Sequence, residues 1–266
     1  MTRHRAAILC LILALAGITI FVEGPWRWRL YGLASAAYLV VLTLGVSLIG
    51  LEFFGRAVCR GPAGKRRVAL TFDDGPNPTV TPQVLKALRR LGVPATFFCL
   101  GERVLDHPDL ARSIVAQGHL MGNHSHRHQW WLNFRGRRFM LQEIRSAQQA
   151  ILSTTGTVPR YYRPPAGLTN PQVGPAARAL ELQVVGWTAR GFDQFTASPS
   201  AIVRRIVRRT TDGSIIVLHD CGLPPERLLA VVEELVSTVR QSGLEFVRLD
   251  QLLEDLPGKS EPPGQR

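Results

Sequence analysis

The sequence predicts an α/β fold, a (β/α) barrel that is either complete or short of some strands, preceded by two transmembrane helices. Two long apolar runs occupy the N-terminal region. Beyond them, short strand-like patterns alternate with amphipathic helical patterns, and this alternation implies a parallel sheet. Polar residues able to do chemistry directly follow several of these strands. In barrel enzymes the carboxyl ends of the strands form the active site, so the sequence predicts an enzyme.

The apolar runs extend from Ala6 to Val22 and from Leu30 to Leu51. Their lengths approach or match the roughly 20 residues that a helix needs to cross the hydrocarbon core of a membrane. A short turn with Trp26 and Trp28 separates them, and tryptophan is enriched where a membrane meets water. We therefore predict a membrane hairpin over residues 1–54.

A signal peptide is the alternative interpretation of the first run. Arg3 and Arg5 precede it, and Ala14-Leu15-Ala16 resembles a cleavage site. Cleavage there would leave a single membrane span. The apolar run continues past this point, which favours the hairpin.

A basic linker over residues 55–66 follows the hairpin and is more positive than the turn between the two helices. The positive-inside tendency places both ends of the hairpin, and with them the catalytic domain, in the cytoplasm. The expected location is therefore a bacterial inner membrane, as an integral protein. A periplasmic or extracellular catalytic domain is the alternative.

The chain of 266 residues is 45% hydrophobic and carries a formal net charge of +12. This charge favours anionic partners. The sequence contains no helix-turn-helix, zinc-finger or RNA-binding signature, so we predict no nucleic acid partner and expect membrane lipid or a phosphate-bearing substrate instead. The cysteines form no metal-binding spacing and are expected to be free thiols. The sequence predicts no particular oligomeric state.

The predicted catalytic domain covers residues 67–255, and a disordered tail over 256–266 is expected to follow. Period-2 patterns predict strands over Val68–Phe72, Ala95–Leu100, His119–Asn123, Gln183–Thr188, Ser214–His219 and Leu244–Leu249. Apolar periodicity, with proline near helix starts and glycine near helix ends, predicts helices over Pro82–Leu91, Pro108–Gln117, Phe139–Ser153, Pro171–Leu182, Ser198–Thr210 and Pro225–Gln241.

Two adjacent carboxylates, Asp73 and Asp74, end the first of these strands. Because the two charges repel, such a pair at a strand end indicates that a cation or a proton separates their roles. The Asp-Gly-Pro sequence is also ordinary turn chemistry, so this motif by itself is ambiguous.

A histidine cluster lies at residues 124–128. His124 and His128 are four residues apart, so one helical turn would present both imidazoles to the same point. Together with a carboxylate oxygen they form a common ligand set for Zn²⁺ or a similar divalent ion. His126 is expected to point elsewhere, toward solvent.

Three further motifs carry charged or titratable residues in places that suggest function. Arg163 precedes two prolines, which stiffen the backbone so that the guanidinium can be aimed at a carboxylate. Asp193 lies six residues after Trp187, beyond another strand, and His219 ends a strand that is entirely apolar. Each residue alone has an ordinary structural explanation, but their recurrence at strand ends favours a common site.

These motifs, in this order, closely resemble the polysaccharide deacetylase (NodB-homology) family, also called carbohydrate esterase family 4. The resemblance spans roughly residues 67–253. It implies an irregular (β/α) barrel, with Asp73 as the general base and Asp74, His124 and His128 as ligands of a divalent metal. Zinc is the expected ion, with cobalt, manganese and nickel as alternatives.

The resemblance also implies roles for the remaining motifs. Arg163 matches the arginine that steadies the base, His219 matches the general acid, and Asp193 matches the aspartate that supports this acid. The implied reaction is hydrolysis of a carbon–nitrogen bond, which removes an acetyl or formyl group from an N-acylated amino sugar, polymeric or lipid-linked.

Three residues depart from the family pattern. Arg190 occupies the place of an aspartate, and Gln194 and Ala166 occupy the places of aromatic residues. An added cation favours a substrate that carries phosphate, such as a lipid-linked amino sugar at the membrane surface. The aromatic and arginine-rich segment 129–138 is compatible with a lipid headgroup zone or with an insertion that packs on the barrel.

Other functions remain open at this stage. The same residues would serve deacetylation of peptidoglycan or an exported polysaccharide on the outer side of the membrane, or hydrolysis of a small non-sugar amide. A catalytically inactive sugar- or lipid-binding membrane protein is the alternative of another class. The complete set of expected site residues argues against it.

Overall fold

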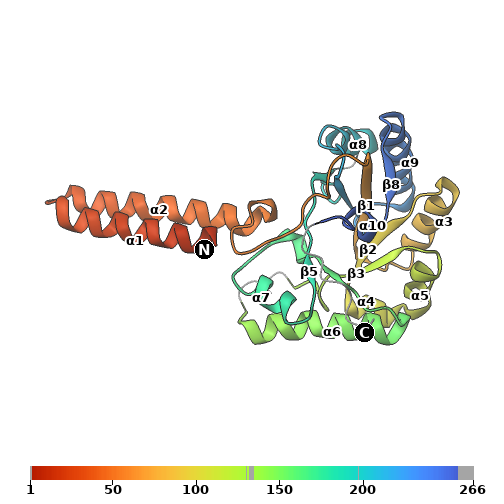
Figure 1. The fold of residues 1–266 in the computed structure, drawn as a ribbon, viewed down its shortest axis with the longest axis horizontal. Coiled ribbons are helices and arrows are strands. Elements are labelled where there is room, and N and C mark those ends of the chain that lie inside the picture. The colour runs from red at the N-terminus through yellow and green to blue at the C-terminus, as the bar shows by residue number, and fades with distance from the viewer. Residues whose placement is uncertain (1, 130, 132–134, 197, 257–266) are drawn as a thin grey trace.

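A computed structural model describes residues 2–129, 131, 135–196 and 198–256 (Figure 1). Helices α1 (Arg3–Phe21) and α2 (Trp26–Ser47) form a hairpin that projects from the α/β domain. Their mean hydropathies over the most apolar windows are 2.0 and 1.7, and only 0% and 6% of these windows are buried. Helices of this length and composition can cross a membrane, and their exposure distinguishes them from the core helices of a soluble domain.

Both ends of the hairpin lie beside the α/β domain. The His4 amide donates to the Phe53 carbonyl at 2.9 Å, which holds the start of α1 against the segment that follows α2. A short 3₁₀ helix, η1 (Ile49–Leu51), makes this turn. If the hairpin spans a membrane, the N-terminus and the α/β domain therefore lie on the same side.

The end of α2 is bonded to the α/β domain. The Thr169 amide donates to the Val46 carbonyl at 2.9 Å, and the Thr169 hydroxyl donates to the Gly45 carbonyl at 3.1 Å. The last carbonyls of a helix have no partner within the helix, so these bonds satisfy groups that would otherwise need water. The phenyl ring of Phe53 packs so closely on Gly45 that a larger residue there would collide with it.

The segment predicted as a basic linker, 55–66, lies along the sheet. Val58 bridges Val185 in parallel and Arg60 bridges Ser214 in antiparallel fashion. These backbone contacts attach the first residues after the hairpin to two separate parts of the domain.

The sheet of the described residues has eight strands, and β1 at its centre pairs with β2, β7 and β8. All the strand pairs are parallel. The strand order β5-β4-β3-β2-β1-β7-β6 ends on β5 and β6, and no ladder joins these two among the described residues, so the sheet is an incomplete barrel. The strands are β1 (Arg67–Gly75), β2 (Ala95–Cys99), β3 (Leu120–Asn123), β4 (Tyr161–Tyr162), β5 (Gln183–Val184), β6 (Ala189–Arg190), β7 (Ile215–His219) and β8 (Glu245–Val247).

Amphipathic helices cover the sheet and bury one apolar face each. In α9, for example, Leu228, Val231, Val232, Leu235 and Val239 recur at helical spacing and are all buried. The helices of the domain are α3 (Thr81–Leu91), α4 (Gly101–Asp106), α5 (Pro108–Ala116), α6 (Arg137–Thr155), α7 (Val173–Arg178), α8 (Pro199–Val207), α9 (Pro225–Gln241) and α10 (Leu249–Leu252), with a 3₁₀ turn η3 (Pro165–Gly167).

Several predicted boundaries were wrong. The predicted strand 183–188 is only β5, because the backbone of Gly186 leaves the ladder: its amide donates to Val58 and its carbonyl accepts from Arg163. The predicted helix 171–182 shortens to α7. The two-residue strands β4 and β6 were not predicted, since so short a run carries no periodicity. The tail predicted over 256–266 lies outside the described residues except for Leu256.

Candidate functional site

Five stretches that are far apart in sequence meet at the carboxyl ends of the strands. Asp73 lies two residues before the end of β1 and pairs in register with His219 at the end of β7. The histidine cluster follows β3, Ala166 lies in the loop after β4, and Arg190 ends β6. Together they line one cavity, formed by Asp73, Asp74, His124, His128, Ala166, Trp187, Arg190, Gln194, Phe195, Val217 and His219.

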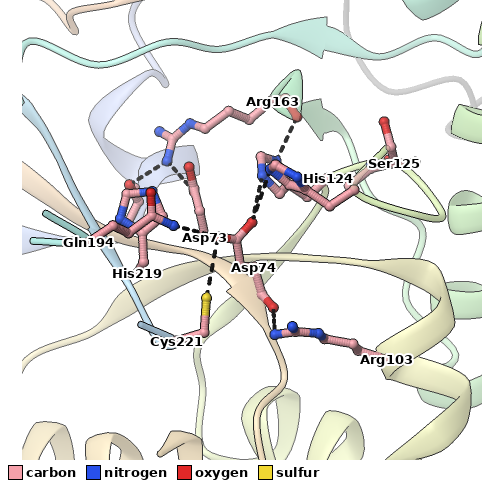
Figure 2. A network of polar contacts seen from close by, with 12 residues as sticks. Asp73, Asp74, Arg103, His124, Ser125, Arg163, Gln194, His219 and Cys221 are labelled. Atoms are coloured by element: carbon pink, nitrogen blue, oxygen red, sulfur yellow. Dashed lines mark hydrogen bonds and ion pairs between the residues drawn. The ribbon is translucent and has the colours of Figure 1, made fainter. Parts of the chain in front are cut away.

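Asp73 and Arg163 form a buried ion pair (Figure 2). An Nη1 of Arg163 lies 2.6 Å from Asp73 Oδ1 and also donates to the Thr71 hydroxyl at 2.7 Å. The second terminal nitrogen donates to the Gly186 carbonyl at 2.9 Å. These bonds use only one Asp73 oxygen, so the other is left for a partner in the cavity.

The Arg163 side chain is completely buried. Its guanidinium carbon lies 4.1 Å from the centre of the Phe98 ring, a favourable cation–π distance. A buried charge is tolerated only when it is paired and hydrogen-bonded, and Arg163 satisfies this condition through Asp73 and its other acceptors. The structure thus aims this arginine at the carboxylate, as the proline-stiffened loop suggested.

Asp74, His124 and His128 come together with their ligand atoms within 4.8 Å of one another. His124 Nε2 and His128 Nε2 lie 3.3 Å and 3.5 Å from Asp74 Oδ1. Tetrahedral ligands at zinc distances of about 2.0–2.1 Å are separated by ~3.4 Å, so the spacing fits such an ion. Asp74 Oδ1 is buried without a hydrogen-bond partner, and a cation would satisfy it. These residues can therefore hold a divalent metal.

The electrostatics of this group also suit a metal site. Burial acts to raise the pKa of Asp74, but its interaction with the side chain of His124, with the charge of His128, holds this pKa well below its usual range. Burial lowers the pKa of His128 below that of a free imidazole. Metals bind a carboxylate and neutral imidazoles, and the burial of His128 favours its neutral form.

The histidines do not lie on one helical turn, so that expectation was wrong. Ser125 between them adopts a left-handed conformation with φ of 71°, and its amide donates to the Asn123 side chain at 2.9 Å. His124 Nδ1 donates to the Arg163 carbonyl at 2.8 Å, which leaves Nε2 for the metal. His126 was expected to face solvent, but its Nδ1 is buried and the ring lies against Gly101.

The second oxygen of Asp74 has partners that the sequence did not reveal. Gln194 Nε2 donates to Asp74 Oδ2 at 3.0 Å, and Cys221 Sγ lies 3.4 Å from the same oxygen. Arg103 donates to the Asp74 backbone carbonyl (Figure 2). Gln194 thus directs the other oxygen, Oδ1, toward the two histidines. It acts as a positioning residue for a metal ligand.

Replacing Gln194 with leucine should weaken Zn²⁺ binding by about 10- to 100-fold, the usual effect of losing a hydrogen bond to a metal ligand. The dissociation constant can be measured on the detergent-solubilised full chain by competition with a chromogenic chelator. Gln241→Leu, on the exposed surface of α9, is the matched control and should leave binding unchanged. Equal Zn²⁺ affinity of Gln194→Leu and the wild type would contradict the positioning role.

His219 is held by Asp193. Its Nδ1 lies 3.0 Å from Asp193 Oδ1, and its backbone amide donates to Asp193 Oδ2 at 2.8 Å. Burial by itself lowers the pKa of His219, but the hydrogen bond and charge of Asp193, with the charges of Asp73 and Asp74, outweigh this effect and raise the pKa above that of a free imidazole. The raised pKa favours the protonated imidazole, and its Nε2 is the nitrogen left to give that proton away.

Asp193→Asn should move the alkaline limb of the pH–activity profile to lower pH. An acid must be protonated to act, and without the carboxylate the pKa of His219 falls, so activity is lost earlier as the pH rises. The profile of kcat/KM for acyl release measures this shift. Asp106→Asn, an exposed change on α4, should leave the limb in place. An unmoved limb in Asp193→Asn would mean that another group is the acid.

The three departures from the family pattern have distinct surroundings. Gln194 contacts Asp74, as described above, while Arg190 and Ala166 line the cavity. Ala166 has a left-handed φ of 53° within η3, so this loop adopts a strained conformation at the cavity wall. Of the aromatic and arginine-rich segment 129–138, residues 130 and 132–134 lie outside the described part. The cysteines are all free, as predicted.

Comparisons with known proteins agree with this geometry. A family model described as polysaccharide deacetylase matches residues 60–185. A peptidoglycan-N-acetylglucosamine deacetylase of Listeria monocytogenes is 34% identical over 70% of this chain, which spans only 39% of that relative. A chitooligosaccharide deacetylase of Sinorhizobium fredii is 39% identical over 65% of this chain and 80% of its own length.

Among solved structures, a peptidoglycan N-acetylglucosamine deacetylase superposes with a TM-score of 0.70 at 27% identity. The match covers 74% of this chain and 92% of that one. The predicted irregular (β/α) barrel is thereby confirmed by this likeness, and the topology shows that it is incomplete. This structural likeness and the relatives above together show that the chain belongs to the polysaccharide deacetylase family, carbohydrate esterase family 4.

Proposed function

We propose that this chain is a metal-dependent hydrolase that removes an acetyl or formyl group from the nitrogen of an amino sugar at a membrane. The observation that carries this proposal is the pairing of Asp73 and His219 in register on neighbouring strands, beside the Asp74, His124 and His128 cluster. A base, an acid and a metal site thus open into one cavity. The deacetylase names of the relatives support the same reaction class.

In this reaction the free oxygen of Asp73 accepts the proton of the attacking water. A divalent ion, when bound, would polarise the acyl carbonyl and acidify the water. Arg163 keeps Asp73 oriented through their ion pair. His219 delivers its proton to the departing nitrogen, which is a poor leaving group without it. The products are a free amine on the sugar and a carboxylate.

Acetate or formate release by the purified full chain tests this proposal. The protein is loaded with one equivalent of Zn²⁺, Co²⁺, Mn²⁺ or Ni²⁺ and offered neutral, phosphate-bearing and lipid-linked N-acyl amino sugars. Release that depends on the metal and is lost in His219→Ala would support the proposal. No release from any of these substrates by stoichiometrically loaded protein would overturn it and favour an inactive binding protein.

We also propose that the substrate is presented at the membrane, as a lipid-linked amino sugar. The support is the attachment of the hairpin to the site: Thr169 bonds the end of α2 and lies three residues after Ala166, which lines the cavity. The hairpin therefore holds the cavity at a fixed place relative to the membrane surface.

The cytoplasmic side is the side that the basic linker favours. Peptidoglycan or an exported polysaccharide, acted on from the outer side, is the second candidate, and the names of the relatives favour it. Reporter fusions after Gly64 distinguish the two. Activity of an exported reporter only would contradict the cytoplasmic site, and activity of a cytoplasmic reporter only would contradict the outer one.

Mass spectrometry of lipid-linked and cell-wall sugars identifies the substrate pool. Cells that carry Asp73→Asn should accumulate the N-acylated form of the natural substrate. Accumulation in the lipid-linked pool supports the first candidate, and accumulation in the wall supports the second.

A further inference from the structure

We propose that Arg190 forms an anion-binding subsite that recognises a phosphate or carboxylate on the sugar part of the substrate. This inference rests on the proposed function and narrows its substrate class. Arg190 ends β6 and lines the same cavity as Asp73 and His219. Its side chain is a cation in this cavity. Whether a carboxylate of the protein already pairs with it decides whether it can bind an anionic ligand.

The guanidinium of Arg190 lies over two aromatic rings. Its Cζ lies 4.5 Å from the centre of the Phe192 ring and 5.4 Å from that of Trp187. Such cation–π contacts hold the guanidinium in place without using its N–H donors. A guanidinium fixed in this way loses little further freedom when it binds an oxyanion.

Arg190 forms no ion pair among the residues that the structure describes. The two aspartates of the cavity are already engaged, Asp73 by Arg163 and Asp74 by the histidines and Gln194. The Nε of Arg190 is buried and has no hydrogen-bond partner. A half-buried guanidinium with unused donors favours an anionic ligand, because phosphate and carboxylate can bond two of its N–H groups at once.

The strand register indicates which part of the substrate carries this anion. Arg190 pairs with Val217 on β7, two residues before His219, and Val217 also lines the cavity. With strands about 4.8 Å apart and about 3.3 Å per residue, the two Cα atoms lie ~8 Å from each other. Arg190 therefore lies near His219 in the cavity, and His219 protonates the nitrogen that stays on the sugar, so we assign the anion to the sugar part of the substrate.

Two kinds of substrate could supply the anion: the phosphate of a lipid-linked sugar, or the lactyl carboxylate of a peptidoglycan fragment. Phe195 lines the cavity and is 80% exposed, and Phe192 is 46% exposed. The exposed ring of Phe195 on the cavity lining would suit the first lipid carbons beyond a phosphate. The experiment below separates the two sources.

Three substrates test the subsite on the metal-loaded full chain. They are a prenyl-diphosphate-linked N-acetylglucosamine, a neutral alkyl glycoside of N-acetylglucosamine with a chain of equal length, and a peptidoglycan disaccharide whose lactyl group is the sole anion. Arg190→Met keeps the packing of the side chain and removes its charge. Arg190→Lys restores the charge without the planar fork. Arg204→Gln, exposed on α8, controls for net charge.

We expect Arg190→Met to lower kcat/KM by about 10- to 100-fold for the anionic substrate that the subsite recognises, either the diphosphate-linked sugar or the disaccharide. The kcat/KM for the neutral glycoside should stay unchanged. Arg190→Lys should recover part of the loss, and Arg204→Gln should show none. Loss with the diphosphate substrate alone identifies phosphate as the ligand, and loss with the disaccharide alone identifies carboxylate. Zn²⁺ affinity should not change, which separates this effect from damage to the metal site.

An equal loss on charged and neutral substrates would show that Arg190 only shapes the cavity and would overturn the subsite. Wild-type protein that prefers the neutral glycoside would overturn it as well. If the wild type hydrolyses none of the three, the proposed function itself fails. The two failures are therefore distinguishable.

Discussion

Asp73→Asn should lower kcat for acyl release by about 100- to 10,000-fold, the usual contribution of a general base. Asparagine has nearly the same shape, and its oxygen can still accept the bond from Arg163 that Asp73 Oδ1 accepts at 2.6 Å. Its amide cannot take a proton from water. The change therefore removes the chemistry while the surrounding structure persists.

Zn²⁺ affinity distinguishes the loss of the general base from damage to the metal site. Asp73 is not one of the clustered ligands, so Asp73→Asn should bind Zn²⁺ as tightly as the wild type. Asp74→Asn is the matched comparison one residue along the chain and should lose both affinity and activity. Activity of Asp73→Asn within tenfold of the wild type, an arbitrary threshold of about 1.4 kcal/mol, would exclude Asp73 as the base.

Arg163→Met should destabilise the α/β domain by about 3–5 kcal/mol, the cost of breaking a buried ion pair. Both partners are almost inaccessible to water, with side chains 0% and 4% exposed. Methionine fills part of the space against Phe98 but leaves Asp73 as an unpaired buried carboxylate. It also leaves the Gly186 carbonyl without its donor. Because His124 Nδ1 donates to the backbone of residue 163, the metal site should remain assembled in the folded fraction.

Denaturant unfolding of the full chain in detergent, followed by tryptophan fluorescence, measures this loss. Arg160→Met, an exposed change three residues earlier, should shift the free energy of unfolding by no more than ~0.5 kcal/mol. Arg163→Lys keeps the charge and should fall between the two. If Arg163→Met had the same free energy of unfolding as the wild type, the burial of Asp73 would not depend on this arginine. The role assigned to Arg163 would then have to be abandoned.

The hairpin is bonded to the part of the α/β domain that carries the site. The bonds from Thr169 to the end of α2 lie beside the loop that carries Arg163 and Ala166. The loop that shapes the cavity is thus the same loop that meets the hairpin. If the hairpin spans a membrane, the fold sets the distance between the cavity and the bilayer.

Much of this protein could be predicted from its sequence because the signals are local. The hairpin follows from two apolar runs, and the alternating strands and helices follow from periodicities within single segments. Two pairs of candidate site residues stand out because the spacing within each pair is short: Asp73 with Asp74, and His124 with His128. Parallel topology then predicts that such residues at strand ends lie at one edge of the sheet.

The tertiary structure alone decided the contacts between residues that are far apart in the sequence. Arg163 meets Asp73 across 90 residues and Gln194 meets Asp74 across 120, and no local pattern encodes either contact. The left-handed turn at Ser125, which replaced the expected helical turn, depends on a bond to Asn123 and on packing around it. Strands of two residues such as β6 form only because a neighbouring strand supplies their hydrogen bonds. Arg190 stands inside the cavity for the same reason, since its place is fixed by the pairing of β6 with β7.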